Sequence, residues 1–125
     1  MIKLDYKNTS PLHEQIANGI KELIVCGALR KDEQLPSVRE LSLGLTVNPN
    51  TVQRAYKTLE TEGIIYSVRG KGNFVATKHE AKGNIIESLY GALLDSTRQL
   101  AFYGEEKADL ISVIDKVFEE REDVK

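Results

Sequence analysis

The sequence contains one cysteine, no tryptophan and no long apolar run. The single Cys26 excludes an internal disulfide and a cysteine cluster, and no other group of residues has the spacing of a metal site. No apolar run approaches the ~18 residues that span a bilayer, and the N-terminus alternates charged and apolar residues, which argues against a secretory signal. We therefore expect a cytoplasmic protein that uses no membrane, no metal and no cofactor.

The chain is also short, with 125 residues, of which 41% are hydrophobic. That length excludes large catalytic frameworks such as a (β/α)₈ barrel, which needs roughly 250 residues, and the apolar fraction is normal for a globular protein. The sequence pattern indicates no nucleophile–base pair and no paired-carboxylate site. These absences indicate that the protein is not an enzyme.

The net charge of −2 conceals a division of the chain into two parts. Residues 1–78 carry 11 Lys/Arg against 8 Asp/Glu, whereas residues 79–125 carry 6 against 11. Such an asymmetry favours a nucleic-acid-binding part followed by a part with another task. The excess of three positive charges is weak evidence by itself, because a solvated surface has similar values.

The first predicted helix runs from Pro11 to Gly27. We expect Ser10 to be its N-cap and Pro11 its first helical residue, where the missing N–H costs nothing. Cys26, close to the helix end, is expected to be a small core residue. Apolar residues at helical spacing form one stripe: Leu12, Ile16, Ile20, Leu23 and Ile24.

A second, short helix is predicted to begin in residues 35–41. Ser37 and Glu40 have the spacing of a capping box, in which each side chain pairs with a free backbone N–H. The stretch 46–49 ends this helix, because a residue before proline avoids the α conformation.

The third predicted helix begins at once, with Asn48 as N-cap and Pro49 in first position, and it runs to Glu62 before Gly63. Its apolar residues share one face: Val52, Ala55, Tyr56 and Leu59. The opposite face carries amide and cationic groups without a carboxylate: Asn50, Gln53, Arg54 and Lys57. Tyr56 is interpreted as a core or wedge residue, whose hydroxyl is able to donate to a phosphate.

Two β-rich runs, 64–68 and 73–76, are joined by Arg69-Gly70-Lys71-Gly72, which predicts a hairpin. Helix, helix, tight turn, helix and hairpin form a winged helix-turn-helix. In that motif the helix after the turn enters the major groove of DNA, where Asn and Gln suit adenine and Arg suits guanine. The predicted fold is therefore mainly α with a small hairpin, and residues 1–78 form the DNA-binding domain.

Residues 79–125 are predicted to form two amphipathic helices that make up a dimerisation tail. Two helices cannot hide both apolar stripes from water by themselves, so we expect a second copy of the chain to cover them. The alternative is that the tail covers the winged helix within one chain. The residues expected at the dimer interface are Ile86, Leu89, Tyr90, Leu93, Leu110, Ile114, Val117 and Phe118.

Residues 10–76 resemble the winged-helix domain of the GntR family of bacterial transcription regulators. The similarity lies in ordered motifs: Pro11-Leu12-His13-Glu14-Gln15-Ile16, Leu35-Pro36-Ser37-Val38-Arg39-Glu40-Leu41, Val47-Asn48-Pro49-Asn50-Thr51-Val52, Ala55-Tyr56, Leu59, Glu62-Gly63 and Gly70-Lys71-Gly72-Asn73-Phe74-Val75. The short tail is similar to that of the YtrA subfamily. This resemblance implies a repressor that binds operator DNA, and the subfamily often controls neighbouring ABC-transporter genes.

Together, the residue types and the matched family positions predict a set of DNA-binding residues: Ser37, Arg39, Asn48, Asn50, Thr51, Gln53, Arg54, Lys57, Arg69, Gly70 and Lys71. Gln53 stands where many members have arginine, which implies a different base preference. Thr46 stands where many have glycine, so a positive φ there would be strained by about 1 kcal/mol.

The leading hypothesis is a homodimeric repressor that binds an inverted repeat in double-stranded DNA. The main rival is a winged-helix adaptor that binds proteins and not DNA. The operator, the regulated genes and the existence of a small-molecule effector are left open, since no residue set marks an effector pocket.

Overall fold

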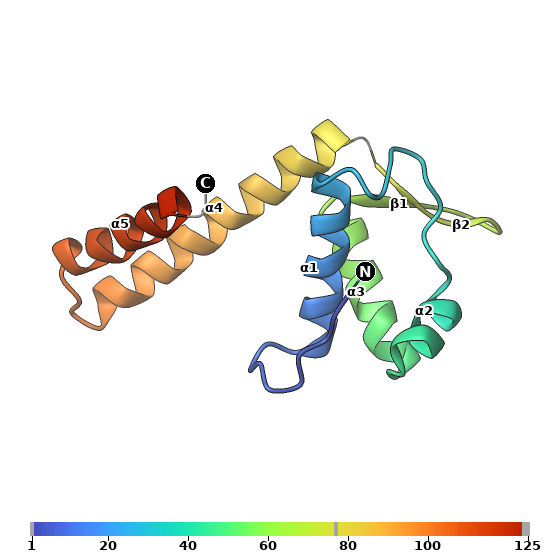
Figure 1. The fold of residues 1–125 in the computed structure, drawn as a ribbon, viewed down its shortest axis with the longest axis horizontal. Helices are drawn as coiled ribbons and strands as arrows, with labels where there is room; N and C mark the ends of the chain where they lie inside the picture. The colour runs from blue at the N-terminus through green and yellow to red at the C-terminus, as the bar shows by residue number, and fades with distance from the viewer. Residues whose placement is uncertain (1, 77, 124–125) are drawn as a thin grey trace. The chain divides into compact units, whose positions relative to one another are not determined.

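The computed structural model describes residues 2–76 and 78–123 and has the mainly helical fold with a small hairpin that the sequence predicts. Its elements in chain order are α1 (Leu12–Val25), α2 (Val38–Leu45), α3 (Pro49–Thr61), β1 (Ile65–Val68), β2 (Gly72–Val75), α4 (Lys78–Phe102) and α5 (Lys107–Asp123), labelled in Figure 1. The chain divides into two units, Met1–Ser88 and Leu89–Lys125, with the boundary inside α4.

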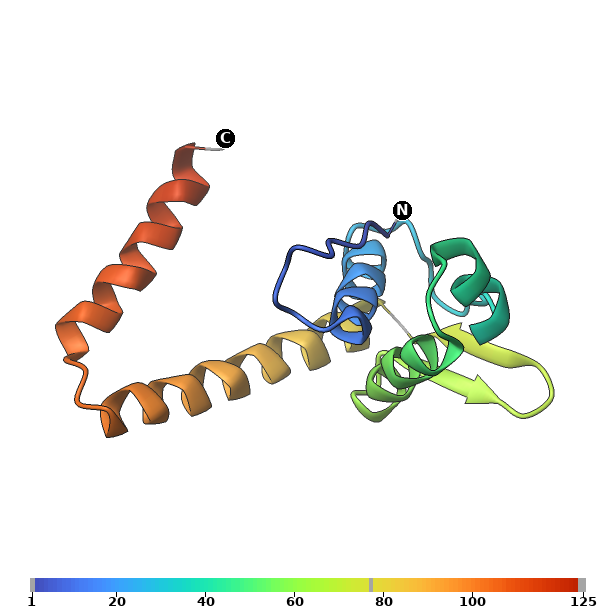
Figure 2. The ribbon, with the colours of Figure 1, turned by 90° about the horizontal axis from the view of Figure 1, so that it is seen from below.

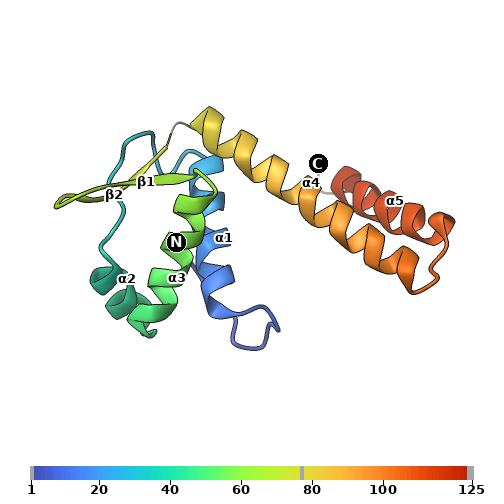
Figure 3. The ribbon, with the colours of Figure 1, turned by 180° about the vertical axis from the view of Figure 1, so that it is seen from behind.

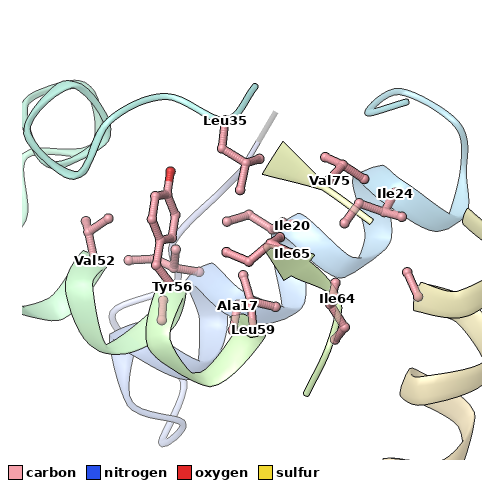
Figure 4. Packing of buried hydrophobic residues seen from close by; sticks show 13 residues of the cluster. Ala17, Ile20, Ile24, Leu35, Val52, Tyr56, Leu59, Ile64, Ile65 and Val75 are labelled. Carbon is pink, nitrogen blue, oxygen red and sulfur yellow. The ribbon is translucent and has the colours of Figure 1, made fainter. Parts of the chain in front are cut away.

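The core of the first unit forms where α1 and α3 lie side by side, as Figure 3 shows. Each helix contributes one apolar face with helical spacing, as the sequence predicts. The tyrosine of this core, Tyr56, directs its hydroxyl toward the segment that precedes α2 (Figure 4). The buried apolar residues are Ile16, Ala17, Ile20, Ile24, Leu35, Val52, Ala55, Tyr56, Leu59, Ile64, Ile65, Val75 and Ala81.

Two predictions at the ends of α1 are wrong. Pro11, in an extended conformation, is the N-cap, and no side chain caps the helix; the carbonyl of Ser10 instead accepts from Gln15 Nε2 at 2.9 Å. Cys26 is exposed and free because it is the C-cap of α1, beyond the last core residue of the helix. Gly27 follows with φ +87° and ends the helix as expected.

The caps of α2 and α3 agree with the predictions. Ser37 Oγ accepts from the Glu40 N–H at 3.0 Å while Glu40 Oε1 accepts from the Ser37 N–H at 3.3 Å, which completes the capping box. Asn48 caps α3, with Pro49 as its first residue. Because each helix is capped by the residue directly before it, local sequence determines where α2 and α3 begin.

The turn between α2 and α3 contains a strained residue. Thr46, the C-cap of α2, has φ 56° and ψ 51°, in the left-handed region. A β-branched side chain is unfavourable there, which is the strain expected from the sequence for a positive φ at this position. The turn is nevertheless kept by hydrogen bonds, including one from the Val47 N–H to the Ser42 carbonyl at 3.0 Å.

We expect Thr46→Gly to raise the free energy of unfolding by about 0.5–1 kcal/mol, because glycine adopts a positive φ without a Cβ clash. The same chemical change at Thr58, an exposed residue inside α3, should lower that free energy, since glycine is a poor helix former. Urea unfolding followed by circular dichroism measures both variants. A Thr46→Gly protein that is as destabilised as Thr58→Gly contradicts the strain.

The hairpin pairs β1 with β2 in an antiparallel register, from Ile65 opposite Val75 to Val68 opposite Gly72. In addition, residues 32–35 pair with the other edge of β2, which the sequence analysis did not predict. Three backbone hydrogen bonds of 2.8–2.9 Å join this segment to β2, and Gln34 forms a bridge with Phe74. Neither alternation nor β-branched residues mark the segment Lys31-Asp32-Glu33-Gln34, so a strand signal is missing there.

The first turns of α4 pack onto the winged-helix core. Ala81 is fully buried and Ile85 is partly buried against the same cluster. Asn84 Nδ2 donates to the carbonyl of Gly63, just after α3, at 3.2 Å. The division between the two units therefore falls after Ser88, later in the chain than the predicted boundary at Lys78.

The second unit contains the end of α4 and α5, joined by a turn in which Gly104 has φ +87°. From Ile86, near the end of the first unit, through the second unit, most large apolar side chains are exposed to solvent. The exposed ones include Ile86, Leu89, Tyr90, Leu93, Ile114, Val117 and Phe118, and Leu110 is half-buried. Within the described ranges, no helix is long and apolar enough to cross a bilayer.

Candidate nucleic-acid interface

The solvent-facing side of α3 carries the amide and cationic groups that the sequence analysis selected. Asn50, Gln53, Arg54 and Lys57 are all exposed, while the opposite side of the helix is buried. Among the described residues, none of these four side chains has a hydrogen bond or an ion pair. The polar face of α3 is therefore free to contact an external partner.

The backbone donors in the first turn of α3 are paired with the N-cap residue Asn48. Asn48 Oδ1 accepts from the Asn50 N–H at 2.8 Å, and the Thr51 N–H donates to the Asn48 carbonyl at 2.9 Å. The first bond uses the side-chain amide oxygen of Asn48 and the second uses its backbone carbonyl, so the Nδ2 donors of Asn48 stay unused. Since the N-terminal end of a helix favours negative charge, this end of α3 is suited to an anionic partner.

Tyr56 fixes α3 to the segment before α2. Its hydroxyl donates to the Pro36 carbonyl at 2.7 Å, and its side chain is 2% exposed. Burial, with a smaller contribution from the charge of Glu40, raises the pKa of Tyr56 from 10.0 to about 12. Tyr56 is thus a core residue. Its hydroxyl donates to the Pro36 carbonyl within the protein and not to an external phosphate.

We expect Tyr56→Phe to lower the free energy of unfolding by about 1–2 kcal/mol, because the Pro36 carbonyl loses its donor. The raised pKa also predicts a pH dependence. The stability contributed by neutral Tyr56 is present below pH 10.0 and is lost as the pH rises toward about 12. Urea unfolding across that range should show a steeper loss for the wild type than for Tyr56→Phe, and parallel losses contradict this role of Tyr56.

The start of α2 places Ser37 and Arg39 at the surface. The Ser37 oxygen serves the capping box, but its hydroxyl proton is still available to an external acceptor. Arg39 is exposed on the first turn of α2, and its carbonyl accepts from the Ser42 hydroxyl at 2.9 Å, which keeps the backbone of that turn in place.

The hairpin has its turn directed away from α3, as Figure 2 shows, and this turn carries Arg69, Gly70 and Lys71. The three residues are exposed. Gly70 has φ +78°, and the Lys71 N–H donates to the Val68 carbonyl at 2.9 Å, which closes the turn. The hairpin therefore holds two cations on a tight turn.

Side chains at the base of the hairpin hold it together. Tyr66 and Phe74 stack with ring centroids 5.7 Å apart. The Tyr66 hydroxyl donates to Asp32 Oδ1 at 2.6 Å, and this hydrogen bond raises the pKa of Tyr66. Asp32 lies in the segment that pairs with β2, so neither this pairing nor the contact with Tyr66 has a signal in the local sequence.

The exposed polar and cationic residues on α2, α3 and the hairpin turn make up the candidate surface, called here the reading surface. The model of the bacterial regulatory proteins of the gntR family matches residues 12–75. The chain belongs to the GntR family. This winged-helix match spans α1 to the end of β2 and confirms the resemblance drawn from the motifs.

Known members of the GntR family are similar to this chain along most of its length. The HTH-type transcriptional repressor YtrA of Bacillus subtilis is 40% identical over 100 residues, which cover 80% of this chain and 75% of that protein. A GntR family transcriptional regulator from Listeria monocytogenes is 32% identical, with a TM-score of 0.62 over 90% of this chain and 98% of the other. The short tail of this GntR chain thus has counterparts among its relatives.

Similar structures include complexes with DNA. One of them is the DNA-binding domain of AraR in complex with operator ORR3, with a TM-score of 0.53 and 31% identity over 59% of this chain and 89% of that one.

Proposed function

We propose that this protein is a transcriptional repressor that binds an inverted-repeat operator as a homodimer, with α3 in the major groove. The observation that carries the proposal is the exposed, unpaired amide and guanidinium face of α3, opposite a buried apolar face. Two similarities support it: a relative named as a repressor and a family fold solved with operator DNA.

Each group of the reading surface has a chemical counterpart on DNA. On α3, the Arg54 guanidinium suits the two major-groove acceptors of guanine, and the amides of Asn50 and Gln53 suit adenine. Arg69 and Lys71 on the hairpin turn suit phosphates, which carry charge but no sequence information. We expect Arg54 to contribute specificity and the hairpin cations to contribute affinity.

The tail supplies the argument for a dimer. Both α4 and α5 carry exposed apolar side chains. These side chains need a second apolar surface that removes them from water. A second copy gives a two-fold arrangement, in which two α3 helices enter major grooves about 34 Å apart on an inverted repeat. Repression then follows when the dimer occupies DNA that RNA polymerase needs. Control of an ABC-transporter operon stays a prediction of the subfamily resemblance.

Selection of bound duplexes from a randomised pool tests the proposal. We expect enrichment of an inverted repeat, and mobility-shift titrations with the enriched duplex should show an affinity that falls steeply with salt. A duplex with one half-site scrambled is the control. A pool without enrichment contradicts the repressor and is the outcome that the winged-helix adaptor predicts.

Lys71→Ala should lower the slope of log affinity against log salt by about 1, because one phosphate contact is lost. Lys7→Ala, an exposed lysine in the segment before α1, is the matched control and should leave the slope unchanged. Titrations at several salt concentrations measure both slopes. Equal slopes for wild type and Lys71→Ala remove Lys71 from the phosphate contacts.

A further inference from the structure

The segment 32–36 connects the two parts of the reading surface. Its backbone pairs with β2 of the hairpin, and the carbonyl of Pro36 accepts from the Tyr56 hydroxyl of α3 at 2.7 Å. Leu35, in the middle of the segment, is 4% exposed and belongs to the core. The segment is therefore fixed to the core while it contacts both the recognition helix and the hairpin.

Gln34 extends this connection to the hairpin turn. Its side-chain Nε2 donates to the Lys71 carbonyl at 2.7 Å, across 37 positions of the sequence. The backbone of Gln34 forms the bridge to Phe74 of β2, so the base of its side chain is held by the sheet. The amide thus reaches from a segment paired with β2 to the turn that carries the cations.

The hairpin turn leaves room for this amide at Gly72. Gly72 has φ +125°, and a Cβ at this residue would lie 2.9 Å from Gln34 Nε2. A side chain at position 72 would therefore displace the amide or the turn. The absence of a Cβ next to the Gln34–Lys71 hydrogen bond is a second, independent feature that fits this contact.

We propose that Gln34 is a positioning residue for DNA binding, which holds the turn with Arg69 and Lys71 in a fixed place relative to α3. This inference rests on the proposed function and names a residue outside the predicted DNA-binding set. Two-stranded hairpins are only marginally ordered by themselves. A turn that is held before binding loses less conformational freedom when its cations meet phosphates.

The test uses Gln34→Met, which keeps the length of the side chain and removes its donor, in the full-length protein. We expect binding of the enriched operator duplex to weaken about 3- to 10-fold and the salt slope to fall. The thermal midpoint should not change, because Gln34 is exposed. Gln99→Met, the same change at an exposed position of α4, is the matched control and should bind like the wild type.

A double-mutant cycle separates positioning from direct contact. In an Arg69→Ala/Lys71→Ala background, Gln34→Met should weaken binding less than two-fold, because the cations that Gln34 positions are gone. Equal losses in both backgrounds overturn the proposal, since Gln34 then acts on DNA by itself or through the fold. An unchanged affinity in the wild-type background overturns it as well.

Hydrogen exchange in the DNA-free protein gives a readout that does not need the operator. The Lys71 amide, which donates to Val68, should exchange faster in Gln34→Met than in Gln99→Met. Unchanged exchange overturns the role of Gln34 whatever the protein binds. If the wild type binds no DNA, the proposed function fails, and this exchange rate still decides whether Gln34 holds the turn.

Discussion

A chain truncated after Ser88 is expected to bind an inverted-repeat operator about 10²–10⁴-fold more weakly than the full-length protein. The truncated chain keeps the whole first unit, including Ala81 and Ile85, which pack on the core of the winged helix. It loses the exposed apolar side chains that follow in α4 and α5. Without a dimer, the second half-site no longer benefits from the first binding event, so binding becomes that of one domain.

The position of this truncation matters for its interpretation. A chain that ends after Lys78 also lacks buried Ala81 and the Asn84 hydrogen bond to Gly63, so a weakened affinity would confuse lost folding with lost dimerisation. Mobility-shift titrations should therefore use the Ser88 truncation, with a half-site duplex as the control, on which both proteins should bind about equally. A full-length protein that sediments as a monomer contradicts the dimer.

Arg54→Ala is expected to weaken operator binding by about 1–3 kcal/mol, which is roughly 5- to 150-fold. Its guanidinium is exposed on α3 and has no hydrogen bond or ion pair among the described residues, so the change should not lower the thermal midpoint. On duplexes in which the guanine that Arg54 contacts is replaced, the wild type and Arg54→Ala should bind with equal affinity. Arg39→Ala on α2 should produce a loss of the same order if Arg39 contacts a base.

Thr61→Ala gives the matched control for Arg54→Ala, because Thr61 is exposed at the last position of α3. Its operator affinity should equal that of the wild type in the same titration. If Arg54→Ala weakens binding equally on every duplex, Arg54 contacts phosphate and not a base. If the affinity does not change at all, Arg54 is not a DNA contact.

Local sequence predicted the helices well because their ends are determined by nearby residues. The Ser37–Glu40 capping box and the Asn48 cap depend on residues at most three apart, and such pairs are visible in a sequence. The exposed face of α3 was predictable for a similar reason, since four apolar residues at helical spacing specify which side is buried. The wrong prediction at Ser10 concerned a choice between adjacent residues, where local signals differ little.

Features that depend on distant residues could not be predicted. The pairing of residues 32–35 with β2 joins segments about 40 positions apart, and nothing in the segment itself indicates a strand. The Gln34–Lys71 hydrogen bond depends on that pairing and was missed for the same reason. Cys26 was assigned to the core from its residue type alone, whereas its place at the helix end leaves it exposed.

Methylation protection of guanine N7 on the enriched operator tests most directly whether α3 reads DNA from the major groove. The account predicts two protected stretches centred about 10 base pairs apart, or a multiple of that distance, and loss of protection at one guanine per half-site with Arg54→Ala. Guanine N7 positions that stay unprotected across the operator, or a pattern that Arg54→Ala leaves unchanged, contradict the account.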